Sequence, residues 1–139
     1  MVFGPFKGMR IRQARLPETD VLASDPPRTT LLRASVDIAR EADGTQAVVA
    51  LDRILHSGRI THAALTAAVM GQPRCRGSAL ARTAVAHSDG RSESPPETRT
   101  RLLLVVAGLS PIPQYEVRAE LTNETRRDLS GSNSTLLAR

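Results

Sequence analysis

Carboxylates and histidines are the residues that could support acid–base or metal chemistry, and few of them lie close together in this sequence. Glu97 follows Ser94 by three residues, a spacing that fits either an active-site carboxylate or the third helical position of a capping box. One cysteine, Cys75, and three scattered histidines do not form a zinc-binding spacing. We expect no metal site from this pattern, and we favour the capping function for Glu97. The histidines are His56, His62 and His87.

Arginine is the dominant charged residue. The chain holds 19 basic and 14 acidic residues, which gives a net charge of +5, and Lys7 is the sole lysine. Such a surface can contact phosphates, although solvated surface charge is the simpler interpretation. Few aromatic residues accompany the arginines, which disfavours base stacking on single strands. The candidate nucleic-acid-binding residues are Arg74, Arg76, Arg82, Arg99 and Arg101.

The composition sets the size and character of the core. A chain of 139 residues fits one domain by default. Because the aromatic residues are one Tyr and two Phe with no Trp, the core must consist of Leu, Val, Ile and Ala. The longest apolar run, Leu102 to Ala107, is much shorter than the ~20 residues of a membrane-spanning helix. We therefore expect a cytoplasmic protein without a membrane partner.

Apolar residues spaced three and four apart predict four helices before residue 88. The first starts after Thr29 or Thr30 and ends near Glu41. The second opens on a capping box formed by Asp43 and Gln46. The third follows Thr61 and the fourth covers 78–86, with Gly58 and Gly71 as stops for the second and third helices. The fourth helix should place Leu80, Ala81, Ala84 and Val85 on one face.

A fifth helix follows a segment rich in turn-forming residues. The turn-forming composition of residues 87–96 predicts that this segment is a linker between two structural units. Ser94 should cap the next helix, which ends before Gly108, and its apolar run from Leu102 to Val106 predicts burial on more than one side.

The complete chain is predicted to be mainly α, a small bundle of about five helices with one or two short strands and a disordered C-terminal tail. One strand is expected near 10–16 and another at 114–117. The predicted divisions are an irregular segment at 1–28, a helical middle domain at 29–88, a linker, helix and strand at 89–118, and the tail at 119–139.

The run SESPPETRTRLLLVVAGLSPIPQYEV at residues 92–117 resembles a known family. It is similar to actinobacterial proteins that end in a very-short-patch-repair-like endonuclease domain of the PD-(D/E)XK class, often behind an AbiEi-type antitoxin winged helix. Three upstream runs resemble the middle region of the same proteins, so the resemblance covers about residues 9–117. These runs are RIRQARLP, PPRTTLLRASVDIAR and AVVALDRIL.

The resemblance implies that residues 89–118 hold the linker, first helix and first strand of a nuclease-like domain. Such a domain binds Mg²⁺ through carboxylates on later strands. Glu97 matches the acidic residue of the family's first helix, and Asp128 in Arg-Arg-Asp-Leu is the candidate for a second carboxylate. The glutamate-bearing Val-Glu-Tyr-Asp-Gly strand has no counterpart before Arg139.

Three functions follow as hypotheses. The first is a truncated, catalytically incomplete relative of these endonucleases, which is not an enzyme and needs no cofactor. The second is a small basic module that binds DNA or a toxin–antitoxin partner. The third is an active endonuclease that requires Mg²⁺. Self-association is expected through Leu102 to Val106 or through the edge of the Tyr115 strand.

Overall fold

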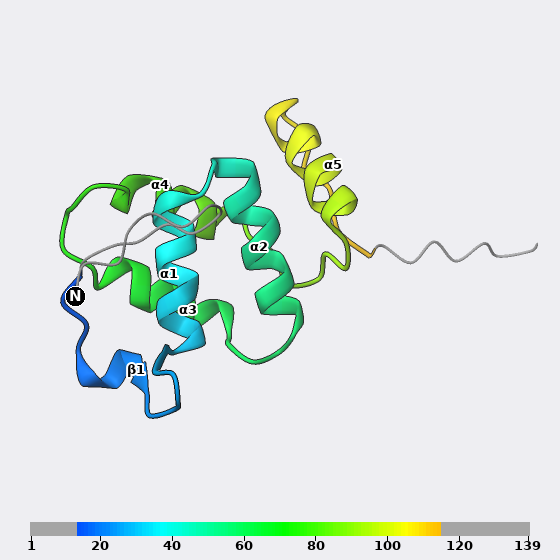
Figure 1. Ribbon diagram of the computed structural model, residues 1–139. Helices are drawn as coiled ribbons and strands as arrows, with labels where there is room; N and C mark the ends of the chain where they lie inside the picture. Colours follow the sequence, from blue (N-terminus) through cyan, green and yellow to red (C-terminus); the bar gives the residue numbers. More distant parts are fainter. Residues whose placement is uncertain (1–13, 115–139) are drawn as a thin grey trace, which may run out of the picture.

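The computed structural model describes residues 14–114 and shows a mainly α-helical protein with one small β-hairpin (Figure 1). The five helices agree with the predicted fold class. Asp128, the predicted Tyr115 strand and the predicted tail at 119–139 lie outside the described residues. The helices are α1 Leu31–Glu41, α2 Gly44–His56, α3 His62–Met70, α4 Ser78–Ala86 and α5 Pro95–Val106.

The hairpin precedes α1. A short 3-10 helix, Glu18–Asp20, leads into β1 (Val21–Leu22), which pairs antiparallel with β2 (Arg28–Thr29). The strand predicted near 10–16 is not present at 14–16, the part of it that the structure describes. The turn at 23–27 contains two consecutive prolines and brings β1 and β2 together, so the strands flank the prolines instead of preceding them.

Side-chain caps at the helix starts explain why most of the predicted boundaries are correct. Thr30 Oγ1 accepts a hydrogen bond from the backbone of α1, and Thr61 Oγ1 and Ser94 Oγ do the same for α3 and α5. Asp43 precedes α2, but its side chain makes no cap bond, so the predicted box with Gln46 does not form. Asp43 is exposed, and its charge still favours the helix N-terminus through the macrodipole.

The core lies among α1, α2, α3 and α4, and α5 packs beside α2 at one side of this bundle (Figure 1). Leu51 and Leu65 are its largest fully buried apolar side chains. Alanines on α1, α2 and α4 let the helix backbones approach closely. The buried apolar residues are Val36, Ala39, Ala47, Val48, Val49, Leu51, Leu55, Leu65, Val69, Ala81, Ala84 and Val85. No described helix combines the length and apolar character that crossing a membrane requires.

One of two predictions about apolar faces is wrong. On α4, Ala81, Ala84 and Val85 of the predicted face are buried, and Leu80, at its edge, is 58% exposed. In α5, Leu103 and Val106 are 71% and 88% exposed, although burial on more than one side was expected. The core contact of α5 is made mainly with α2, so the opposite side of its apolar run faces solvent.

Three glycines of the described residues, Gly58, Gly77 and Gly108, adopt the left-handed backbone conformation at helix boundaries. Gly58 follows α2 with φ +69° and has open space where a Cβ would lie. Gly77 precedes α4 with φ +82°, and a Cβ there would lie 2.3 Å from the carbonyl oxygen of Arg40. The loop before α4 can therefore approach α1 only because residue 77 has no side chain.

We predict that Gly77→Ala destabilises the protein more than Gly58→Ala. Both changes place a side chain at positive φ, which costs about 1 kcal/mol in each variant. Gly77→Ala adds the clash with Arg40 and should cost at least about 1 kcal/mol more in the free energy of unfolding. Urea denaturation measures the difference, and equal losses in the two variants would disprove the close approach to α1.

Candidate functional site

A buried carboxylate on α2 organises the polar interior of the molecule. Asp52 is fully buried, and its Oδ1 accepts a hydrogen bond of 2.7 Å from the backbone N–H of Asp89. Its Oδ2 accepts from Thr98 Oγ1 at 2.7 Å and from Arg101 Nη2 at 2.8 Å. These donors belong to residues 89–101, so one side chain of α2 holds both the segment before α5 and α5 itself.

Arg101 is the other half of this network. Besides Asp52, its guanidinium donates to the carbonyl oxygen of His87 at 2.8 Å and to Ser92 Oγ at 3.3 Å. Thr98 and Arg101 are the buried residues of α5, and their three-residue spacing puts both side chains on the face toward α2. The prediction that Arg101 contacts nucleic acid is therefore wrong, because its guanidinium is buried and hydrogen-bonded inside the protein.

Sequence analysis missed Asp52, although the sequence contains a signal for it. Val48 and Leu55 lie four residues before and three residues after Asp52, so this acidic residue falls on the apolar face of α2. A charge on a buried face requires a partner. Arg101 is 49 positions away, and that separation cannot be deduced from the helical pattern.

Asp89 and Gly90, in the predicted linker, are hydrogen-bonded to α2. His56 Nδ1 lies 3.1 Å from the carbonyl oxygen of Gly90, whose backbone packs against Leu55. Hydrogen bonds from the Arg91 side chain lower the pKa of Asp89, and Asp89 raises the pKa of Arg91. Ionised Asp89 thus favours the folded loop above the carboxyl's unfolded pKa, and this contribution is lost as the pH falls through its lowered folded value.

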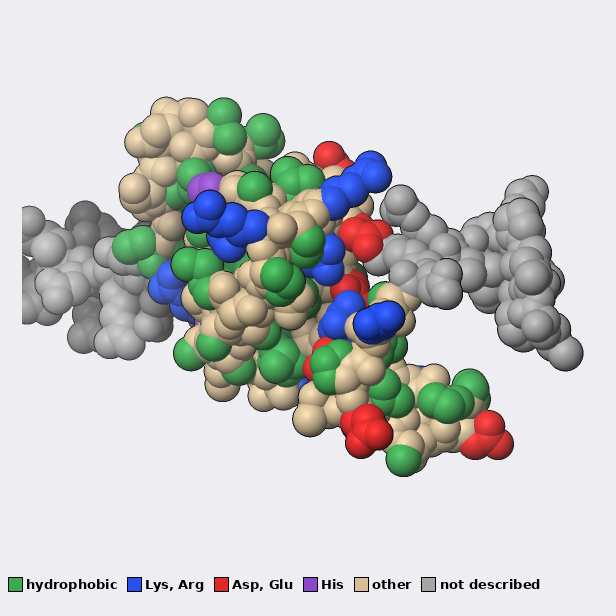
Figure 2. Space-filling view, turned by 90° about the vertical axis from the view of Figure 1, so that its left-hand side faces the viewer, with side chains coloured by type: hydrophobic (Ala, Val, Ile, Leu, Met, Phe, Trp, Pro, Cys, Tyr) green, Lys and Arg blue, Asp and Glu red, His purple; other side chains and the backbone are tan. Residues whose placement is uncertain are grey.

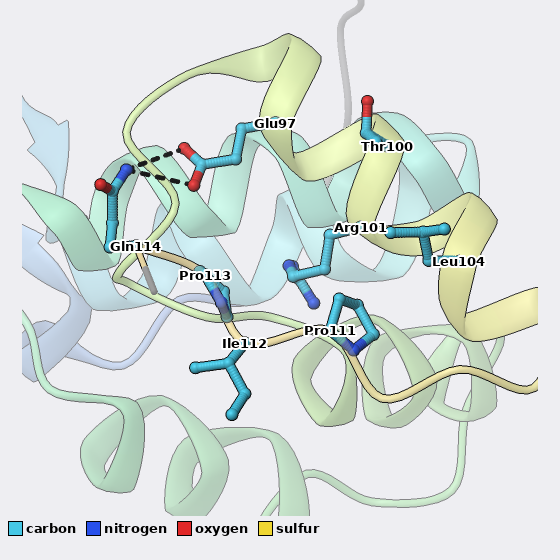
Figure 3. A pocket seen from close by; sticks show the side chains of 8 residues that line it. All are labelled: Glu97, Thr100, Arg101, Leu104, Pro111, Ile112, Pro113 and Gln114. Atoms are coloured by element: carbon cyan, nitrogen blue, oxygen red, sulfur yellow. Dashed lines mark hydrogen bonds between the residues drawn. The ribbon is translucent and has the colours of Figure 1, made fainter. Parts of the chain in front are cut away.

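Glu97 lies at the start of α5, beside an open pocket of about 280 Å³ (Figure 3). Its Oε2 accepts a hydrogen bond of 2.8 Å from the backbone N–H of Glu93, and Gln114 Nε2 donates to both carboxylate oxygens at 3.1 and 3.4 Å. Only half of the predicted capping box forms: Ser94 Oγ accepts from the backbone N–H of Glu97 at 3.4 Å, but the Glu97 carboxylate binds the backbone N–H of Glu93 and not that of Ser94. The pocket is lined by Glu97, Thr100, Arg101, Leu104, Pro111, Ile112, Pro113 and Gln114.

The candidate catalytic residues are not brought together within the described structure. Glu97 has the structural partners given above, and Asp128 lies outside the described residues. Among residues 14–114, no three His, Cys, Asp or Glu side chains are grouped so that they could hold a metal ion.

The loop between α3 and α4 carries two of the predicted nucleic-acid-binding residues. Arg74 and Arg76 are exposed there on either side of Cys75. Arg40 of α1 holds the loop, because its Nη2 lies 3.2 Å from Cys75 Sγ and donates to the carbonyl oxygen of Arg76 at 3.1 Å. With Gly77 in contact with the Arg40 backbone, the loop has a defined conformation. We call residues 72–77 the basic loop.

The other two predicted arginines lie on different helices. Arg82 is half-buried on α4, in an apolar pocket of about 300 Å³ that also contains His62. Arg99 is exposed on α5, next to Leu103 and Val106. Figure 2 shows that Arg side chains on one face of the molecule are interspersed with acidic side chains.

Comparisons with known proteins found two uncharacterized relatives, from two strains of Mycobacterium tuberculosis. Each is 31% identical to this chain over 115 residues, which cover 81% of the chain and 41% of the relative. The chain thus spans less than half the length of these relatives. No protein-family model matches the sequence. No solved structure matches it either.

We predict that Arg101→Met destabilises the protein by about 3–5 kcal/mol, because it leaves the Asp52 carboxylate buried without its ion-pair partner. Combining Arg101→Met with Asp52→Asn, which removes the buried charge but keeps a polar group for the Asp89 N–H and the Thr98 hydroxyl, should recover at least about 1 kcal/mol of that loss. Chemical denaturation measures all variants.

Arg53→Met is the matched control, since Arg53 is exposed beside Asp52 on α2, and its effect should stay within about 0.5 kcal/mol. If Arg101→Met costs no more than Arg53→Met, the network does not hold α5.

Proposed function

We propose that this chain is a catalytically incomplete relative of very-short-patch-repair-like endonucleases and that its helical part binds the backbone of duplex DNA. The basic loop is the proposed contact. The observation that carries the proposal is the support of this loop by Arg40, which binds the side chain of Cys75 and the carbonyl oxygen of Arg76, next to the exposed side chains of Arg74 and Arg76.

The charge and geometry of the basic loop suit phosphate oxygens. No acidic residue occurs between Gly71 and Arg82, so the arginines of this stretch are not neutralised by sequence neighbours. The nearest acidic residue to the supporting Arg40 in sequence is Glu41, at the end of α1. Guanidinium groups bind phosphate with two parallel hydrogen bonds. A loop that is already ordered loses little conformational entropy on binding. Phosphate contacts of this kind do not distinguish base sequence.

The surroundings of Glu97 support the noncatalytic half of the proposal. In the family that the sequence resembles, the matching acidic residue belongs to the active site. Here both carboxylate oxygens accept hydrogen bonds from Glu93 or Gln114, and these bonds connect the start of α5 to the segment after it. A structural role explains Glu97 without any metal.

We predict that Arg74→Ala together with Arg76→Ala weakens binding to a duplex DNA about tenfold, independently of its sequence. Losing two phosphate contacts should also reduce the slope of log affinity against log salt by about two. Fluorescence anisotropy at several salt concentrations measures both quantities.

The control is Arg53→Ala with Arg59→Ala, which removes the same charge from exposed positions on and just after α2. Equal losses in the two double variants would show that net charge, and not the basic loop, governs binding. Unchanged affinity in the loop variant would contradict the proposal.

We also predict that Glu97→Gln does not alter DNA cleavage in the presence of Mg²⁺. The wild-type chain and the variant should both leave a supercoiled plasmid intact, and circular dichroism should show that the variant is folded. Cleavage by the wild-type chain that Glu97→Gln abolishes would instead establish an active endonuclease.

A further inference from the structure

We infer that α5 is a self-association surface through which two copies of this chain pair antiparallel about a twofold axis. This proposal rests on exposed residues of α5, whereas the DNA-binding proposal rests on the loop between α3 and α4.

The surface is a continuous stripe along α5. Arg99, Leu102, Leu103 and Val106 follow the i, i+3, i+4, i+7 spacing of one helix face. Together with Thr45 they line one open pocket of about 290 Å³. Leu102 is partly buried against the core, whereas Leu103 and Val106 are 71% and 88% exposed, so the outer part of this stripe has no cover within the described structure.

A second apolar pocket extends the stripe across the bundle. It measures about 260 Å³, lies among α2, α4 and α5, and shares Leu102 and Val106 with the first pocket. Leu80 of α4, itself 58% exposed, lines this second pocket. Contiguous apolar surface of this kind usually marks an interaction site.

The charges at the two ends of the stripe favour a second copy of the same helix. The final turn of α5 contains no basic residue, so the partial negative charge at its C-terminus is not offset there. Gly108 and Leu109 donate hydrogen bonds to the carbonyl oxygens of Val105 and Leu104, as in a Schellman cap. The carbonyl groups of Val106 and Ala107 lie beyond these two bonds, at the end of the helix where a cation is favoured.

An antiparallel arrangement places a cation at that end. If two α5 helices pair about an axis between Leu102 and Leu103, Arg99 lies opposite Val106 of the partner subunit. The guanidinium then meets the C-terminal end of the second helix, and the leucines meet at the centre. The same contact occurs twice, as twofold symmetry requires. A parallel pair would instead bring the two arginines together.

Sedimentation velocity of the 139-residue chain tests the pairing. The wild-type chain should form a dimer as its concentration rises. Leu103→Glu and Val106→Arg should each raise the dissociation constant at least about tenfold, because the first buries a carboxylate in the apolar contact and the second places a like charge opposite Arg99 of the partner subunit. Both residues are exposed, so the variants should stay folded by circular dichroism.

Met70→Glu is the control, since Met70 is 62% exposed on α3, and this variant should dimerise as the wild-type chain does. A wild-type chain that stays monomeric at all concentrations would overturn the inference. A dimer that survives both α5 substitutions would overturn it as well.

Disulfide cross-linking tests the antiparallel geometry. In a Cys75→Ser background, a mixture of the Arg99→Cys and Val106→Cys chains should cross-link to each other, whereas either chain alone should not. Residues 99 and 106 are about 10 Å apart along the helix, so two cysteines at the same position would exceed the reach of a disulfide in the antiparallel pair. Cross-links formed within either single variant, without the mixed product, would contradict the arrangement.

Discussion

The carboxylate of Asp52 lies inside the helical bundle and takes hydrogen bonds that its own helix does not supply. A buried charge is strongly unfavourable unless it is paired and hydrogen-bonded. The partners are Asp89, Thr98 and Arg101, all of which follow α4 in sequence. Among the described helices, α5 contacts mainly α2. The Asp52 network joins these two helices, so it determines where α5 and the segment before it lie.

The position of α5 has consequences on both of its sides. The side with Thr98 and Arg101 faces α2, so much of the apolar run that follows points away from the core. At the N-terminal end of the helix, Glu97 is hydrogen-bonded to Glu93 and Gln114 and lines an open pocket. The helix is thus attached through buried polar residues as well as through Leu102, and it leaves two apolar side chains, Leu103 and Val106, exposed.

Local signals in the sequence predict most of the helical structure, but they do not identify hydrogen-bond partners that are far apart in sequence. Thr30, Thr61 and Ser94 cap the helices they were expected to cap, because a cap depends on residues within one turn. Arg101 was assigned to the surface because arginine is mostly exposed, and its partner in α2 is far away in sequence.

The apolar run of α5 was misjudged for a related reason. Its hydrophobicity indicates that it should be covered, but the pattern does not tell whether the cover belongs to the same bundle. The basic loop could be predicted only in part. Its arginines are evident from the sequence, whereas the support from Arg40 comes from a helix more than thirty residues earlier.

Hydrogen exchange of backbone amides tests most directly whether the Asp52 network joins α5 to the bundle. If it does, the amides of Thr98 to Leu102 should exchange with the same free energy of opening as those around Leu51 in α2, because both require global unfolding. An opening free energy for α5 that lies more than about 1 kcal/mol below that of α2 would show that α5 detaches independently and would contradict the account.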